Sequence, residues 1–167
     1  MDLTQKRIVL IGGAGLVGSH IVDQLVDEPV REIVVFDNLL RGTRANLSTA
    51  MRSPKVRLVE GSITDRDAVK RVIDGADGVF MLASLWLGEC VNDPRLAWEV
   101  NTLGTWNVVD ACLAAGKPRI VYSSSASVYG NALHTPMTEE HPFNNRCLLY
   151  TSPSPRDRTR SRMPSSA

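Results

Sequence analysis

Residues 11–20 read IGGAGLVGSH and place Gly12, Gly15 and Gly18 between a short apolar run and an amphipathic stretch. Three glycines at this spacing are typical of a strand-to-helix turn that binds a dinucleotide. Gly12 permits a tight turn, Gly15 lets the backbone approach a pyrophosphate, and Gly18 lets the helix lie close to the sheet. The helix that follows would point free N–H groups and the positive end of its dipole at the phosphates.

The rest of the chain alternates short β-branched runs with longer amphipathic stretches, which predicts repeated strand–helix units on a parallel sheet. The fold class expected is α/β, a Rossmann-type doubly wound sheet in the order 3-2-1-4-5, ending before the last strands and a C-terminal substrate region. The fifth strand would then be an uncovered edge, which favours marginal stability. The strands are expected at residues 7–11, 32–36, 56–60, 78–82 and 119–123.

Four helices are expected between these strands. The first spans Leu16 to Asp27, and its apolar stripe is Val17, Ile21 and Leu25 at i, i+4 and i+8. A weak helix covers 43–51, a third begins behind Thr64 as N-cap, and a long one spans 94–115. Trp98 and Trp106 on the long helix are interpreted as packing residues, whereas Trp86 and Glu89 are candidates for substrate contact.

Composition favours one ordinary globular domain. The 167 residues are 43% hydrophobic and 22% charged, and no apolar run approaches the length of a membrane span. The expected location is cytoplasmic, with no membrane or nucleic-acid partner. The three cysteines and three histidines have no metal-ligand or disulfide-framework spacing, so no metal is expected.

Asp37 indicates which dinucleotide the turn would bind. It ends the second expected strand, 19 residues after Gly18, where a carboxylate can accept hydrogen bonds from both ribose hydroxyls. The same carboxylate would repel a 2′-phosphate, so the sequence favours NAD over NADP. Arg41 and Arg44 lie just downstream and are the residues that could accommodate such a phosphate.

In these motifs the chain resembles the extended short-chain dehydrogenase/reductase family, in its NAD-dependent epimerase/dehydratase branch, typified by UDP-glucose 4-epimerases. The resemblance spans residues 6 to about 145 and includes VVFDNLLRG, VFMLAS, VNTLGTWNVVDAC and IVYSSSASVYG. It implies a nucleotide-sugar substrate and a possible homodimer in the full-length parent. It also implies that the cofactor contacts or is supported by Gly12, Gly15, Leu16, Val17, Gly18, Asp37, Asn38, Ser62, Ile63, Leu82, Ala83, Ser84 and Asn101.

Two positions depart from the family pattern. Ser62 replaces an acidic residue near the adenine, and Met81 replaces a histidine in the fourth strand. Neither residue would perform chemistry, so the departures concern affinity more than reaction type.

The catalytic set of this family is incomplete here. The resemblance implies a tyrosine that exchanges a proton with a substrate hydroxyl, a lysine four residues later, and a serine that matches Ser125. No YxxxK occurs in the chain. Tyr150 lies 25 residues after Ser125, but the residue at +4 is Ser154. We therefore expect the chain as written to be inactive.

Residues 147–167 differ from the rest of the chain. They read CLLYTSPSPRDRTRSRMPSSA, without apolar periodicity, and composition alone predicts disorder. Residues 147–157 also match a translation of the transposon-end sequencing adapter, and 158–167 read as an index plus a flow-cell primer. The expected organisation is an incomplete dinucleotide-binding domain at 1–146, followed by an adapter-derived tail at 147–167.

Three functions stay open at this stage. The first is the N-terminal, NAD-binding part of a nucleotide-sugar epimerase or dehydratase that acts by transient hydride transfer. The second is an NAD(P)-dependent reductase or dehydrogenase of a small carbonyl or steroid alcohol. The third is a non-catalytic dinucleotide-sensing module, in which the absence of YxxxK would be natural.

Overall fold

The computed structural model describes residues 2–143, so the expected adapter-derived tail lies outside the described residues. The chain divides into two compact units, Met1–Ser123 and Ser124–Ala167. The first unit holds the sheet and every α-helix of the described chain. In the second unit, the described residues include one 3-10 turn, Ala126–Tyr129.

Five parallel strands form one sheet in the order β3-β2-β1-β4-β5, which confirms the predicted topology. In the register of the central strands, Ile11 of β1 lies opposite Phe36 of β2 and Met81 of β4. The strand bounds agree with the expected ones to within one residue at each end: β1 Arg7–Ile11, β2 Glu32–Asp37, β3 Val56–Glu60, β4 Gly78–Met81 and β5 Arg119–Tyr122.

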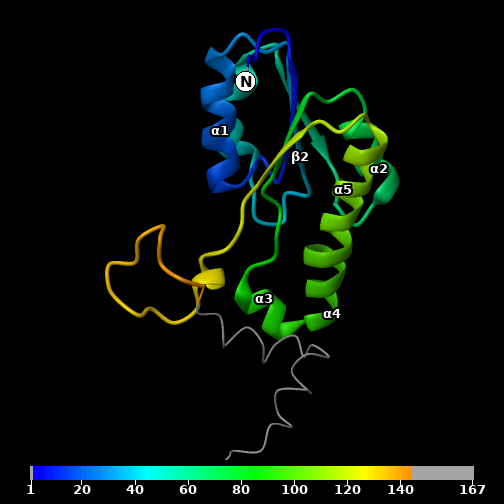
Figure 1. Ribbon diagram of the computed structural model, residues 1–167. Coiled ribbons are helices and arrows are strands. Elements are labelled where there is room, and N and C mark those ends of the chain that lie inside the picture. The colour runs from blue at the N-terminus through cyan, green and yellow to red at the C-terminus, as the bar shows by residue number, and fades with distance from the viewer. Residues whose placement is uncertain (1, 144–167) are drawn as a thin grey trace, which may run out of the picture. The chain divides into compact units, whose positions relative to one another are not determined.

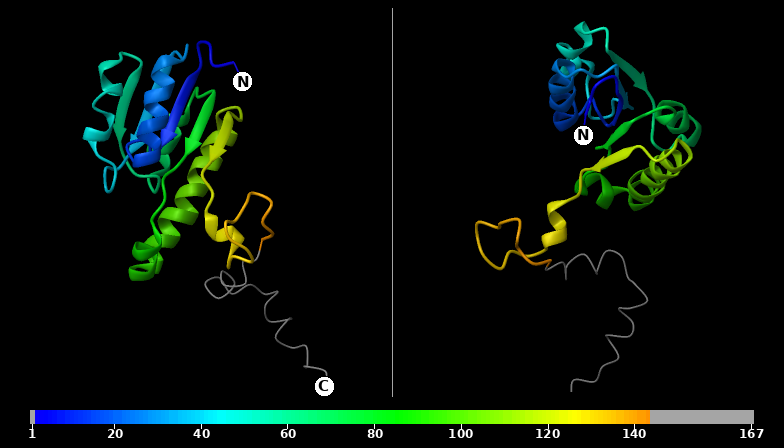
Figure 2. Two further views of the ribbon diagram at one scale, coloured as in Figure 1. Left: turned by 90° about the vertical axis from the view of Figure 1, so that its left-hand side faces the viewer. Right: turned by 45° about the horizontal axis from the view of Figure 1, so that its top comes forward.

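Helices cover both faces of the sheet. Helix α1 (Leu16–Asp27) lies on one face, and α2 (Arg66–Ile73) and α5 (Thr105–Ala114) lie together on the other (Figure 1). Figure 2 shows the same layers from two other directions. Because parallel strands require crossover connections, this arrangement brings the loops after the strands to one edge of the sheet.

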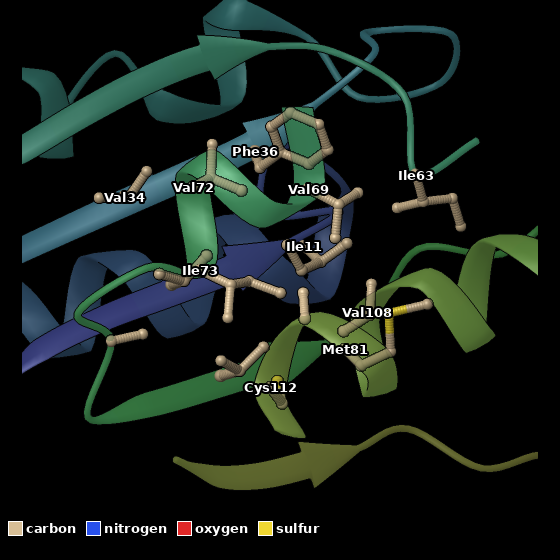
Figure 3. Close-up of a cluster of buried hydrophobic side chains, with 14 residues drawn as sticks. Ile11, Val34, Phe36, Ile63, Val69, Val72, Ile73, Met81, Val108 and Cys112 are labelled. Atoms are coloured by element: carbon tan, nitrogen blue, oxygen red, sulfur yellow. The ribbon is translucent and has the colours of Figure 1, made fainter. Parts of the chain in front are cut away.

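Each face has its own core, because successive side chains of a strand point to opposite sides. Ile8 and Leu10 of β1 pack with the α1 side chains, and Val9 and Ile11 pack with those of α2 and α5. Figure 3 shows this second core, where side chains from the strands and both helices meet. Burial there raises the pKa of the Cys112 thiol to about 11, which leaves it protonated and unreactive at neutral pH.

Helix α1 has the predicted bounds, and two of the three stripe residues pack as expected: Leu25 is buried and Ile21 packs against the same core. The prediction was wrong for Val17, which is 60% exposed. Gly18 is buried in the first turn instead, and a glycine carries no apolar signal.

Two further expectations are corrected. The weak helix at 43–51 is two 3-10 turns, η1 (Arg44–Leu47) and η2 (Ala50–Arg52). The N-cap of α2 is Asp65 and not Thr64, since the Asp65 carboxylate accepts hydrogen bonds from the N–H groups of Asp67 and Ala68. Thr64 instead pairs its hydroxyl with that of Ser62 at 2.8 Å.

The long helix expected at 94–115 contains three segments: α4 (Pro94–Ala97), a π-helical stretch η3 (Trp98–Gly104) and α5. A short helix, α3 (Leu87–Asn92), precedes them and was not predicted. No helix among the described residues is both long enough and apolar enough to cross a membrane.

Several large apolar side chains lie at the surface of the first unit. The interpretation of Trp98 and Trp106 as packing residues was wrong for the described chain, because they are 57% and 62% exposed. The edge strand β5 is exposed along its whole length, with Val121 at 47% and Tyr122 at 58%. The expectation of an uncovered fifth strand is therefore confirmed.

Arg7 connects three elements at the end of the sheet opposite the Gly-rich turn. Its Nε donates to Oε2 of Glu32 at 2.7 Å, and its Nη1 donates to the carbonyls of Val72 and Asp74 at 2.9 and 2.8 Å. The side chain is only 10% exposed. Arg7 thus satisfies carbonyls at the C-terminal end of α2, which have no partners within the helix.

Replacement of Arg7 should be strongly destabilising. R7A leaves two carbonyls without their donor and leaves the Glu32 carboxylate with Arg57 alone, and we expect it to lower the free energy of unfolding by about 2–4 kcal/mol. Urea unfolding followed by circular dichroism measures this loss. The matched control is R95A, which removes an i,i+4 pair with Glu99 whose arginine is 90% exposed and should cost less than about 0.5 kcal/mol. Equal losses in the two variants would contradict the assigned role.

Acid should weaken the same cluster. Burial by itself would raise the pKa of Glu32, but the hydrogen bonds and charges of Arg7 and Arg57 outweigh it and lower the pKa below its ordinary value of 4.5. A carboxyl with a depressed folded pKa contributes stability above that ordinary value and loses it as pH falls through the folded pKa. We expect the unfolding free energy to decline below about pH 4.5, and to decline less steeply in E32Q. Parallel pH profiles of the two proteins would count against this account.

Candidate functional site

The Gly-rich turn joins β1 to α1 through very close backbone contacts. Gly12 has φ +81°, and a Cβ on it would lie 2.6 Å from the backbone nitrogen of Ala83. A Cβ on Gly18 would lie 2.6 Å from the carbonyl oxygen of Gly12 and from Cα of Gly13. The helix therefore lies directly against the turn at Gly18. By contrast, a Cβ on Gly15 would meet only the Gly12 oxygen, at 3.4 Å.

The start of α1 offers N–H groups to a ligand. Gly15 is the N-cap, it makes no side-chain capping bond, and the first turn contains no acidic residue. The first N–H groups of a helix have no intrahelical acceptor, and the helix dipole adds a partial positive charge there. This end of α1 is therefore suited to an anionic group such as a phosphate.

Asp37 ties the turn to the loop after β2. Its Oδ2 accepts from the N–H of Ala14 at 2.9 Å, and its Oδ1 accepts from the N–H of Leu39 at 2.8 Å. Leu39 has φ +56°, an unusual conformation for a non-glycine residue that this second bond helps to hold. The Ala14 carbonyl in turn accepts from Asn46 Nδ2 at 2.8 Å. Asp37 is 8% exposed, so a buried carboxylate stands at the junction of the two loops.

A groove lies at the carboxyl ends of β1–β4, where doubly wound sheets bind ligands. Nine of the thirteen cofactor residues predicted from sequence line it: Gly12, Gly15, Asp37, Asn38, Ser62, Ile63, Leu82, Ala83 and Ser84. Sequence reasoning missed other lining residues, namely Phe36, Leu40, Gly42, Gly61, Leu85 and Val100. Gly61 offered a signal in the sequence, a glycine directly after the third strand, and the structure gives the reason: a Cβ there would lie 2.5 Å from the Phe36 ring.

Four predicted cofactor residues are not among the groove's lining. Leu16 and Val17, in the first turn of α1, are 75% and 60% exposed, and Gly18 is buried against the turn. Asn101 lies behind the loop that follows β4. Its Oδ1 accepts from the N–H of Leu85 at 2.8 Å, and its Nδ2 donates to the Leu85 carbonyl at 3.3 Å. Asn101 therefore braces the wall of the groove.

Arg41 and Trp86 connect the loops after β2 and β4. The Arg41 guanidinium carbon lies 5.3 Å from the centroid of a Trp86 ring, within the range of a cation–π contact. Arg41 lines the groove, and Trp86 is 58% exposed. The main-chain N–H of Trp86 donates to the Glu89 carboxylate at 3.1 Å, so Glu89 fixes the start of α3.

Ser125 belongs to the second unit. Its carbonyl accepts from the N–H of Val128 at 3.1 Å, at the 3-10 turn Ala126–Tyr129. Further along, the N–H of Leu133 donates to Nε2 of the buried His141 at 3.0 Å. Tyr150, the tyrosine that the sequence analysis set aside, lies outside the described residues.

The fold and the groove define the class of protein, a Rossmann-type α/β domain with a Gly-rich turn between β1 and α1. The model of the NAD dependent epimerase/dehydratase family matches residues 8–151. The chain belongs to this family. The predicted resemblance is thereby confirmed.

Individual proteins are also similar to this chain in sequence. The chain is 35% identical over 140 residues to UDP-glucose 4-epimerase of Streptomyces lividans, covering 81% of this chain and 41% of that protein. It is 31% identical over 137 residues to 3beta-hydroxysteroid-dehydrogenase/decarboxylase isoform 2 of Arabidopsis thaliana, covering 78% of this chain and 24% of that protein. The chain thus spans less than half the length of these curated relatives.

A solved structure gives the same result for the fold. The structure of DesIV, a dTDP-glucose 4,6-dehydratase from Streptomyces venezuelae with NAD and TYD bound, superimposes with a TM-score of 0.74 at 33% identity. The match covers 82% of this chain and 45% of DesIV.

Substitutions at Gly18 and Gly15 should have different effects on stability, because Gly18 is needed for packing and Gly15 for the approach of a ligand. G18A forces a Cβ into the backbone of the turn, and we expect it to lower the unfolding free energy by more than about 2 kcal/mol. G15A adds a Cβ at ordinary contact distance, so we expect a change below about 1 kcal/mol. Thermal unfolding followed by circular dichroism compares the two variants, and equal destabilisation would refute this division of roles.

Proposed function

We propose that this chain contains the N-terminal, NAD-binding part of a nucleotide-sugar epimerase or dehydratase. The observation that carries the proposal is the groove in which the Gly-rich turn and the buried Asp37 carboxylate lie together. Its supports are the family match and the likeness to a sugar-nucleotide dehydratase structure that holds NAD.

The described residues fit a dinucleotide. The uncapped end of α1 would hold the pyrophosphate, and the lack of a side chain at Gly15 leaves room for it. Each Asp37 oxygen already accepts one backbone N–H, and a carboxylate oxygen has a second lone pair for a ribose hydroxyl. Leu82, Ala83 and Ser84 would form the nicotinamide side, and Ser62 and Ile63 the adenine side.

When bound, NAD would supply a hydride acceptor that can return the hydride to the same substrate molecule. The protein's part is to hold the dinucleotide and to move the proton of the substrate hydroxyl. Ser125 is proposed to hydrogen-bond that substrate oxygen. The YxxxK tyrosine and lysine that would carry the proton are absent from this sequence.

Selectivity for NAD tests the proposal directly. We expect the chain to bind NAD at least about tenfold more tightly than NADP, a difference of about 1.4 kcal/mol, because the Asp37 charge repels a 2′-phosphate. Isothermal titration calorimetry with both nucleotides measures the ratio. D37N should reduce the preference for NAD over NADP, whereas G15A should weaken the binding of both nucleotides. Equal or tighter binding of NADP by the wild-type chain would sink the assignment of NAD.

Catalysis by the chain as written is the next test. With NAD present, we expect no interconversion of UDP-glucose and UDP-galactose above the blank, because the proton-transferring pair is missing. Measured turnover by the 167-residue chain would contradict this expectation. Restoration of a YGxxK sequence after Arg146, together with the C-terminal substrate region, should produce turnover of a nucleotide sugar.

We also propose that residues 147–167 are encoded by a sequencing adapter, on the strength of the eleven-residue match at 147–157. The family match includes 147–151 and ends there, so it leaves 152–167 unmatched. Re-sequencing of the source DNA across the Arg146 codon, with an adapter-free amplicon, is the decisive measurement. A genomic CLLYTSPSPRD would overturn this proposal and favour the dinucleotide-sensing module.

A second candidate is favoured by one observation, the similarity to the Arabidopsis hydroxysteroid dehydrogenase/decarboxylase. In that case the parent would oxidise a steroid alcohol or reduce a small carbonyl through the same cofactor groove. A substrate panel on the restored chain, with a sterol alcohol beside the nucleotide sugars, separates the two candidates.

A further inference from the structure

Asn107 of α5 reaches across to the loop between β3 and α2. Its Nδ2 donates to the main-chain carbonyl of Ile63 at 2.9 Å, a contact between residues 44 positions apart. Ile63 lines the cofactor groove next to Ser62. A residue outside the groove therefore holds a peptide group of the groove wall.

The same helical region supports Ile63 a second time. Gly104 is buried one turn before Asn107, and a Cβ on it would lie 2.5 Å from Cγ1 of Ile63. The Ile63 side chain is 5% exposed and belongs to the core that also contains Val108 of α5 (Figure 3). The side chain and the carbonyl of Ile63 are thus fixed by neighbouring turns of one helical segment.

The loop around Ile63 also has local order. Ser62 and Thr64 share a hydroxyl–hydroxyl hydrogen bond of 2.8 Å, and the N–H of Asp65 donates to the Ser62 carbonyl at 3.0 Å. These bonds connect residues within the loop and do not attach it to the rest of the domain. The Gly61 N–H attaches the start of the loop to the Asp37 carbonyl at 3.0 Å, and the Asn107 bond attaches the Ile63 peptide group itself to α5.

We infer that Asn107 is a positioning residue for the purine end of the dinucleotide, acting through the Ile63 carbonyl. The inference rests on the proposed function, in which Ser62 and Ile63 form the adenine side. A base is distinguished by the donors and acceptors on its edge, so a displaced peptide group should reduce discrimination between bases as well as affinity.

The experiment compares NAD with nicotinamide hypoxanthine dinucleotide, which carries an oxygen acceptor in place of the adenine amino group. Calorimetric Kd values are measured for the wild-type chain, N107A and N107D. The matched control is N46D, because Asn46 makes a bond of the same kind, Nδ2 to the Ala14 carbonyl at 2.8 Å, beneath the phosphate turn. Circular dichroism melts accompany each variant.

We expect the wild-type preference for NAD over the hypoxanthine analogue to fall at least about fivefold in N107A and N107D, about 1 kcal/mol. N46D should weaken both nucleotides by the same factor and keep their ratio. If the Asn107 variants do not fold, G104A is the alternative, because its added Cβ would push against the Ile63 side chain. G104A should lower the same preference for NAD over the hypoxanthine analogue.

Two results would overturn the inference, and they can be told apart. An unchanged ratio in folded N107A and N107D leaves the proposed function intact and removes the positioning role, whether both nucleotides keep their affinity or weaken equally. Equal weakening would assign Asn107 a purely structural role. No binding of NAD by the wild-type chain overturns the proposed function, and the inference with it.

Discussion

The backbone contact between Gly18 and the Gly12–Gly13 turn is the constraint on which the other features of the groove depend. A helix can lie this close to the preceding turn only if no Cβ intervenes. The close approach aims the start of α1 at the groove and leaves the Ala14 N–H within reach of Asp37. Asp37 then holds the loop after β2, whose Leu39 adopts a positive φ. The position of the Asp37 carboxylate on β2 thus depends on the lack of a side chain at Gly18 of α1.

The groove walls depend on polar side chains that reach from one element to the backbone of another. Asn46 binds the Ala14 carbonyl, Asn101 binds both the main-chain N–H and the carbonyl of Leu85, and Asn107 binds the Ile63 carbonyl. Parallel strands end in loops whose peptide groups have left the sheet ladder and need other partners. Asparagine amides supply them, and the π-helical stretch η3 contains Asn101 itself.

The sequence predicted the strands well because each is a short β-branched run bounded by turn residues, and their order followed from the repeated strand–helix pattern. Glycine spacing and Asp37 carry specific signals and predicted part of the groove. The resemblance to the family supplied the other predicted lining residues, Asn38, Ser62, Ile63, Leu82, Ala83 and Ser84. The sequence predicted less well those features that depend on the path of the chain in space and not on residue type. Asp65 and Thr64 are both good N-caps, and only the path of the chain selects Asp65. The Arg41–Trp86 contact joins loops that are distant in sequence, so no local pattern could reveal it.

The surface position of the tryptophans has a consequence for spectroscopy. Trp86, Trp98 and Trp106 are the three tryptophans of the chain, and each is more than half exposed, at 58%, 57% and 62%. Indoles that already contact water in the native state change their surroundings little on denaturation. The tryptophans of the folded chain will therefore emit at long wavelength, and their emission will change little when the core unfolds. Added iodide, in contrast, will quench these exposed rings in the folded chain. A loss of quenching will therefore report that a bound molecule covers them.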